Sequence, residues 1–202
     1  MSTLTDLPDF VTTLNAAITS DHKRDRPTAK AVVTALLQAE TAKVHRLKYP
    51  LESLLGDWRL WFTAPRQAHL QSGVAVGKGF YIPQIAPAQI SFYASTADSS
   101  QLEIANQIQC GALLFKLTGP AKYLGKKNLL AFDFTQMQLC LFNRTVYSGS
   151  FRRGNSHRDF ANQPIAELPF FAFFLVTENF MAARGRGGGL AIWAKETTIS
   201  TP

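Results

Sequence analysis

The chain has 202 residues, of which 46% are hydrophobic and 17% charged, and its formal net charge is +7. This balance excludes wholesale disorder, and the length suits one domain with a substantial core. The positive charge favours an anionic partner, and because the basic residues are dispersed along the chain, we expect a membrane surface ahead of nucleic acid.

Helical periodicity is confined to the first part of the chain. In TDLPDFVTTLNAAITS, apolar residues such as Leu14 and Ile18 recur at the spacing of one helical face. A second amphipathic pattern follows in TAKAVVTALLQAETAKVHR, with Leu36 on its apolar side. We therefore predict two helices in residues 1–50, packed on a β-barrel domain formed by residues 51–202.

After Leu55 the apolar period changes to two, which is typical of β-strands. Regular strands without intervening helices pair antiparallel, so we predict about eight to ten strands in a sandwich or a closed barrel. A closed barrel leaves no exposed edge. ALLFKL and FFAFFLV are apolar on both faces and need an outer cover, for which the two helices are available. The strand-like segments are DWRLWFTAP, GVAVGKGFYI, AQISFYAS, QLEIANQI, GALLFKLTG, NLLAFDF, QMQLCLFN, TVYSGSF, FFAFFLV and GLAIWAKE.

The strand around Trp58 predicts which face points inward. Trp58, Leu60 and Phe62 share one face, and the opposite face holds Arg59, so we place the first three inside. An eight-stranded barrel is either filled by its side chains or holds one small ligand, and the sequence leaves both open. The residues that we expect in the interior, as ligand-binding candidates, are Trp58, Leu60, Phe62, Phe92, Phe132, Leu139 and Trp193.

The sequence favours neither catalysis nor a metal site. GVAVGKG departs from the phosphate-binding loop in spacing and lacks the following Ser or Thr. The four histidines stand apart without metal-ligand spacing. Ser156, His157 and Asp159 are neighbours in one polar segment, where a catalytic triad is seldom formed. We therefore expect no enzyme activity.

The cysteines and the longest apolar runs indicate where in the cell the protein is found. Cys110 and Cys140 do not make a disulfide framework, and their strand-like surroundings favour buried free thiols. No apolar segment typical of a secretory leader is seen near the N-terminus. The longest apolar run, PFFAFFLV, is far shorter than the ~20 residues of a membrane-spanning helix. We expect a soluble protein or one peripheral to a membrane.

The glycine cluster in MAARGRGGGLAIWAKE has two interpretations. RNA-binding RGG tracts are long and repeated, whereas this cluster occurs once and lies between two strand-like runs. Glycines supply the positive φ of a tight turn, so a hairpin joining the last two strands is favoured. Arg184 and Arg186 then lie at the barrel rim with Arg59, where they would select a polar or anionic ligand end.

Two segments carry a resemblance to a known family. LLGDWRLWFTA and FMAARGRGGGLAIWAKE are similar to the entry strand and the closing Arg-Gly hairpin of the plastid lipid-associated proteins, or fibrillins, of chloroplasts and cyanobacteria. Phe180-Met181-Ala182 departs from the family pattern. The resemblance implies a lipocalin-like antiparallel barrel at the thylakoid surface, or at lipid bodies, that binds a lipid or isoprenoid such as a carotenoid or quinone.

The sequence is compatible with four functions. The leading one is non-enzymatic binding of a hydrophobic molecule at the cytoplasmic side of the thylakoid membrane, or in a chloroplast for a mature plant form, with no other cofactor. The alternatives are a bilin lyase or chaperone on a similar barrel, an assembly factor of a photosynthetic complex with a filled barrel, and RNA binding. A hollow interior is the observation that separates the first from the third.

Overall fold

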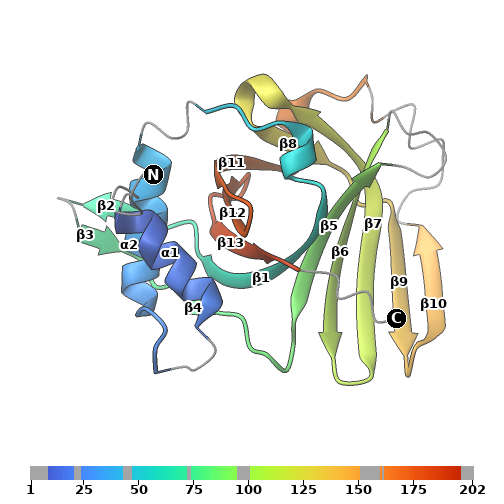
Figure 1. The fold of residues 1–202 in the computed structure, drawn as a ribbon. Helices are drawn as coiled ribbons and strands as arrows, with labels where there is room; N and C mark the ends of the chain where they lie inside the picture. Colours follow the sequence, from blue (N-terminus) through green and yellow to red (C-terminus); the bar gives the residue numbers. More distant parts are fainter. Residues whose placement is uncertain are drawn as a thin grey trace, which may run out of the picture.

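The computed structural model describes residues 9–20, 24–42, 47–71, 74–94, 101–150, 160 and 162–196. It confirms a mainly β chain with two helices and a closed antiparallel barrel of eight strands (Figure 1). The helices are α1 (Asp9–Thr19) and α2 (Ala29–Thr41). The barrel strands are β1 (Gly56–Ala64), β5 (Ala88–Ala94), β6 (Leu102–Cys110), β7 (Leu113–Leu124), β8 (Leu129–Phe132), β11 (Phe170–Val176), β12 (Phe180–Gly185) and β13 (Leu190–Lys195).

Shorter elements connect or extend the barrel. A small hairpin of β2 (His69–Gln71) and β3 (Val74–Val76) lies near the helices, and β4 (Phe80–Tyr81) pairs with β1 (Figure 1). β9 (Gln136–Leu141) and β10 (Arg144–Ser150) continue the sheet beyond the barrel. The single-turn 3-10 helices are η2 (Leu51–Ser53), η3 (Gly125–Lys127) and η4 (Ile165–Glu167).

The long strand β7 both closes the barrel and extends it. Its first half pairs with β9, and its second half pairs with β8, which returns through β11, β12 and β13 to β1. The two pairings separate at Gly119, where a Cβ atom would lie 1.9 Å from the backbone oxygen of Asp133. Only glycine permits this close approach of two backbones.

Beyond the barrel, four antiparallel strands form a sheet that we call the extension. It comprises residues 106–118 of the β6–β7 hairpin together with β9 and β10, and it leads away from the barrel on the side opposite the helices (Figure 1). ALLFKL belongs to this sheet, and its leucines are half-buried or exposed. The expectation that the helices cover this segment is therefore wrong.

Helices α1 and α2 pack on the outside of the barrel, over β1, β11, β12 and β13. Leu14, Leu36 and Leu37 form one buried cluster with Phe174 and Leu175 of the FFAFFLV strand. The predicted cover is therefore confirmed for this strand. A β-bulge at Phe174, between Phe173 and Leu175, places both Phe174 and Leu175 beneath the helices, whereas Phe173 points into the barrel.

A second β-bulge changes the inward face of β1. Leu60 pairs with Trp193 but Phe62 pairs with Ile192, so Trp61 is an extra residue in β1. Because side chains alternate along a strand, one extra residue moves every later side chain to the other face. Phe62 consequently lies outside the barrel, in the cluster beneath the helices, and its predicted interior position is wrong.

One end of the barrel is closed and filled by side chains. Trp58 and Phe92 are fully buried there, and the indole Nε1 of Trp58 donates to the backbone oxygen of Leu54 at 2.8 Å. The rings of Phe92 and Phe173 meet edge to face at a centroid distance of 6.3 Å. These side chains pack directly against one another, as in a protein interior.

The segment preceding β1 is tied to the barrel by a buried polar network. Asn128, held in a left-handed conformation with φ 50°, accepts from the backbone N–H of Tyr49 at 3.0 Å. The Tyr123 hydroxyl donates to the backbone oxygen of Tyr49 at 2.9 Å. Burial, reinforced by the neighbouring Tyr49, raises the pKa of Tyr123 to about 12.

This network predicts a loss of stability in alkali. Unfolded Tyr123 ionises at its ordinary pKa of 10, whereas the folded phenol keeps its proton to about 12. The contribution of the buried Tyr123 phenol to the free energy of unfolding is therefore complete below pH 10 and is lost as the pH rises from 10 to 12. Thermal unfolding followed across this range is expected to show a smaller alkaline decline for Tyr123→Phe than for wild type. An equal decline in both would contradict the assignment.

The glycine cluster forms the turn of the β12–β13 hairpin, as predicted. The N–H of Gly185 donates to the oxygen of Gly189 at 2.9 Å, and the N–H of Gly188 donates to the oxygen of Gly185 at 2.8 Å. Gly188 has a φ of 86°, the positive value that a three-residue hairpin loop requires at this position. The hairpin therefore forms part of the barrel rather than a tail.

Candidate functional site

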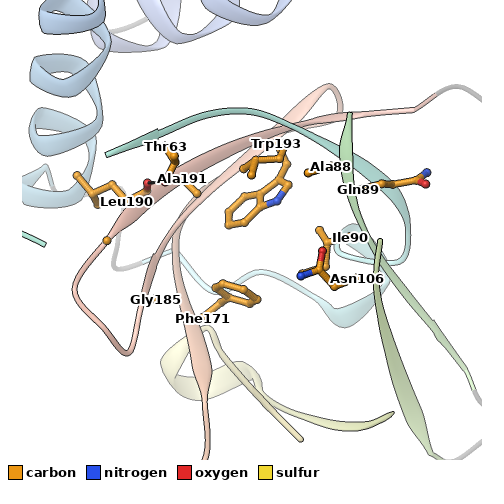
Figure 2. Close-up of a pocket in the computed structure, with 12 residues that line it drawn as sticks. Thr63, Ala88, Gln89, Ile90, Asn106, Phe171, Gly185, Leu190, Ala191 and Trp193 are labelled. Atoms are coloured by element: carbon orange, nitrogen blue, oxygen red, sulfur yellow. Dashed lines mark hydrogen bonds between the residues drawn. The ribbon is translucent and has the colours of Figure 1, made fainter. Parts of the chain in front are cut away.

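The open end of the barrel holds a cavity of about 270 Å³ (Figure 2). It lies at the rim formed by the β12–β13 hairpin, the start of β5 and the middle of β6. The prediction of a filled or hollow barrel thus has a mixed outcome: the closed end is filled and the mouth is hollow. The lining residues are Leu60, Thr63, Ala88, Gln89, Ile90, Asn106, Phe171, Gly185, Gly189, Leu190, Ala191 and Trp193.

Two aromatic rings form the principal walls of this mouth cavity. Trp193 from β13 and Phe171 from β11 meet edge to face at a centroid distance of 5.4 Å. Phe171 also stacks on Phe132 at 5.1 Å, which holds it against the filled core. The walls are therefore rigid and apolar, a surface suited to a flat ring or a hydrocarbon chain.

One amide group faces this apolar space. The side chain of Asn106 points toward the side of the cavity where Trp193 and Phe171 lie (Figure 2), because Asn106 pairs with the inward-facing Ile90 on β5. An amide offers one acceptor and two donors. The other amide on the lining, Gln89, points away and donates to Glu196 at 2.7 Å.

The lining carries no charged side chain among the described residues. The hydroxyl of Thr63 donates a hydrogen bond to the backbone oxygen of Leu190 at 3.1 Å. Gly185 and Gly189 lower one side of the rim, because they place no side chain there. The cavity therefore suits a neutral apolar group with a hydrogen-bonding substituent, and an ionised group inside it would be left without a counter-charge.

Only two of the seven predicted interior residues line the cavity. Leu60 and Trp193 line it, whereas Trp58, Phe92 and Phe132 belong to the filled core behind it. Leu139 is wrong as an interior residue, because β9 lies outside the closed ring of strands. Phe62 lies beneath the helices, as described above.

Two of the three predicted rim arginines face away from the mouth. Arg59 lies over the ring of Trp61 at 5.0 Å on the outer surface. Arg184 forms a two-pronged ion pair with Glu40 of α2, with both N–O distances 2.5 Å, and hydrogen bonding to Glu40 raises its pKa. Both were wrongly placed, because each side chain projects from the outer face of its strand. Arg186 alone is exposed on the rim hairpin, where it donates to the oxygen of Glu167 at 2.6 Å.

Sequence reasoning missed Asn106, Phe171 and Ala191. Asn106 had a detectable signal: it interrupts the apolar series of QLEIANQI at a position where Leu102, Ile104 and Ile108 are apolar. A polar residue at an inward-facing position is a candidate ligand contact. Phe171 had no such signal, since FFAFFLV offers an aromatic ring to both faces.

The lining of the mouth cavity includes no Cys, His, Asp or Glu from the described residues. Within the described ranges, no group of three or more His, Cys, Asp and Glu is placed to hold a metal ion. Ser156, His157 and Asp159 lie outside those ranges. Cys140 is a buried free thiol, as predicted, but Cys110 is exposed near the β6–β7 turn. No helix in the described part is long and apolar enough to cross a membrane.

No protein-family model and no curated protein sequence matches the chain.

Proposed function

We propose that this protein binds a neutral hydrophobic molecule, of the lipid or isoprenoid class, with one end in the mouth cavity. The observation that carries the proposal is the cavity itself: rigid aromatic walls, one inward amide and no charge. Transfer of apolar surface from water supplies the driving force at roughly 25 cal/mol per Å². No step of catalysis is required of any residue.

The cavity volume limits how much of the ligand enters. At about 270 Å³ it is slightly smaller than the roughly 300–1,000 Å³ typical of sites for drug-sized molecules. It accommodates one ring rather than a whole carotenoid or long-chain quinone. The tail then leaves through the mouth and lies along the inner face of the extension, where Phe115 and Leu117 continue the barrel interior.

Asn106 selects among ligand ends. Its amide can donate to a carbonyl or accept from a hydroxyl, which fits a quinone or a hydroxylated isoprenoid ring. A fatty-acid carboxylate, or the acidic side chains of a bilin, would find no cation on the lining. Of the polar or anionic ligand ends predicted from the rim arginines, the geometry therefore favours a neutral polar end, and it favours such a ligand over a bilin.

The location of the protein is proposed from the family resemblance. The segments LLGDWRLWFTA and FMAARGRGGGLAIWAKE support a fibrillin-like protein at the thylakoid surface of a cyanobacterium or in a chloroplast. A carotenoid or a plastoquinone-like molecule is then the ligand of choice, and a photosynthetic complex is a further partner.

Fluorescence quenching tests the proposal. Trp193 lines the cavity, so decylubiquinone is expected to quench its emission saturably, while decanoic acid, with a similar tail and a charged end, is expected to bind much more weakly. Trp193→Phe should remove most of the quenching, because it removes the fluorophore that lines the cavity, while equilibrium dialysis measures quinone binding independently of fluorescence. The absence of saturable binding, together with no lipid in organic extracts of the purified protein, would refute the proposal.

A further inference from the structure

Three turns at one edge of the sheet expose large apolar side chains. They are the loop 83–87 before β5, the β6–β7 turn and the β9–β10 turn, which lie together at the lower edge of Figure 1. Ile85 is 82% exposed and Phe142 is 75% exposed. Leu113 and Leu141, a cross-strand pair between them, are also exposed. We call Ile85, Leu113, Leu141 and Phe142 the apolar edge.

Backbone hydrogen bonds hold these turns beside one another. The N–H of Gln109 donates to the oxygen of Pro87 at 3.0 Å, and the N–H of Phe142 donates to the oxygen of Ala112 at 2.9 Å. Phe142 and Asn143 both have positive φ, 49° and 60°, as a tight two-residue hairpin turn requires. The apolar edge is therefore a fixed feature of the sheet and not a set of independent loops.

The extension is amphipathic, and its apolar face leads from the edge to the mouth cavity. Ile108, Phe115 and Leu139 share one face by direct cross-strand pairing, and this face also holds Asn106 of the cavity. The opposite face carries Gln107, Lys116 and Gln138. The apolar surface therefore runs without interruption from the turns to the ligand site.

The charges of the extension select the partner. Its only charged side chains are Lys116 and Arg144, both basic, and the loop 83–87 is uncharged. Arg144 is exposed two residues after Phe142. Exposed apolar side chains favour insertion at the headgroup boundary of a bilayer, and Arg144 beside them favours anionic lipids. A soluble partner would instead need a complementary apolar surface of its own.

We infer that the apolar edge docks on an anionic lipid bilayer, with the mouth cavity opening toward the membrane. A hydrophobic ligand then passes between the bilayer and the cavity along the inner face of the extension, without crossing bulk water. The transfer step rests on the proposed function, whereas docking itself does not.

Vesicle flotation with the full chain tests the docking. Wild type is expected to bind vesicles of phosphatidylcholine with phosphatidylglycerol more tightly than vesicles of phosphatidylcholine alone. The double variant Ile85→Ser/Phe142→Ser is expected to bind about tenfold more weakly. Phe80→Ser is the matched control, because Phe80 is 58% exposed but lies on β4, near the helices; its binding should stay within about twofold of wild type.

The outcomes separate docking from ligand binding. The double variant should still bind decylubiquinone in vesicle-free buffer. A cavity-filling variant should no longer bind the quinone but should bind vesicles as wild type does. Equal losses in the double variant and in Phe80→Ser, or no vesicle binding by wild type, would overturn the inference. So would a wild-type dimer in light scattering that becomes monomeric in the double variant with unchanged vesicle binding, because the edge would then be the contact with a second copy.

Discussion

Ala191→Trp is expected to weaken quinone binding by about 100-fold, equivalent to about 2.7 kcal/mol. Ala191 lies on the inward face of β13, opposite Ala183 and between the rim glycines and Trp193. An indole added at this position occupies much of a cavity of about 270 Å³, so the ligand ring has no place to enter. Isothermal titration calorimetry or equilibrium dialysis measures the loss directly.

Two further variants control for a trivial loss of structure. Ser148→Trp adds the same side chain on the exposed polar face of β10, far along the sheet from the cavity, and should leave binding unchanged. Asn106→Leu keeps the cavity apolar and removes only the amide; it should weaken the quinone about tenfold, near the value of one hydrogen bond to a neutral group. Full binding by folded Ala191→Trp would show that the ligand site lies elsewhere.

Trp58→Ala is expected to lower the free energy of unfolding by about 3–5 kcal/mol. Trp58 is fully buried in the closed end of the barrel, so its removal leaves a large cavity among aromatic neighbours. It also removes the donor to the Leu54 oxygen. For a chain of this length, each kcal/mol corresponds to about 2–4 °C in the unfolding temperature, so the decrease should be evident in thermal scans.

Trp61→Ala provides the matched comparison for Trp58→Ala. Trp61 lies three positions along the same strand, but it is the bulged residue on the outer surface, half-buried between Arg26 and Arg59. Loss of its contacts is expected to cost about 1–2 kcal/mol. Urea unfolding followed by circular dichroism measures both variants. A smaller loss for Trp58→Ala than for Trp61→Ala would contradict the placement of the filled end.

Much of the architecture was readable from the residues because it depends on local patterns. Period-two alternation and short apolar runs identified strands without telling which of them close the barrel, and helical periodicity identified α1 and α2. The hairpin at Gly185–Gly189 followed from glycines placed between two strand-like runs. These features need only the residue types and their spacing, since they arise from contacts within one element or between chain neighbours.

The faces of the strands could not be predicted in the same way. The bulges at Trp61 and Phe174 exist only where β1 meets β13 and where β11 meets β12. Each bulge exchanges inside for outside along the rest of its strand, which sent Phe62 to the helices. The predicted interior position of Leu139 was wrong for a related reason. The alternation around it correctly indicates a strand, but that strand, β9, lies outside the closed ring of barrel strands.

The sequence by itself determined that this chain has two helices followed by an antiparallel β-structure with an aromatic interior, because alternation and apolar content force burial of one strand face. The tertiary structure alone decided where the cavity lies and which residues line it. Pairing of β7 with both β8 and β9 closed the barrel and left the extension outside it, and β12 presents Arg184 on its outer face, where it pairs with Glu40 of α2. Such outcomes depend on partners far apart in the chain, 144 residues in that ion pair, and spacing along a strand carries no information about them.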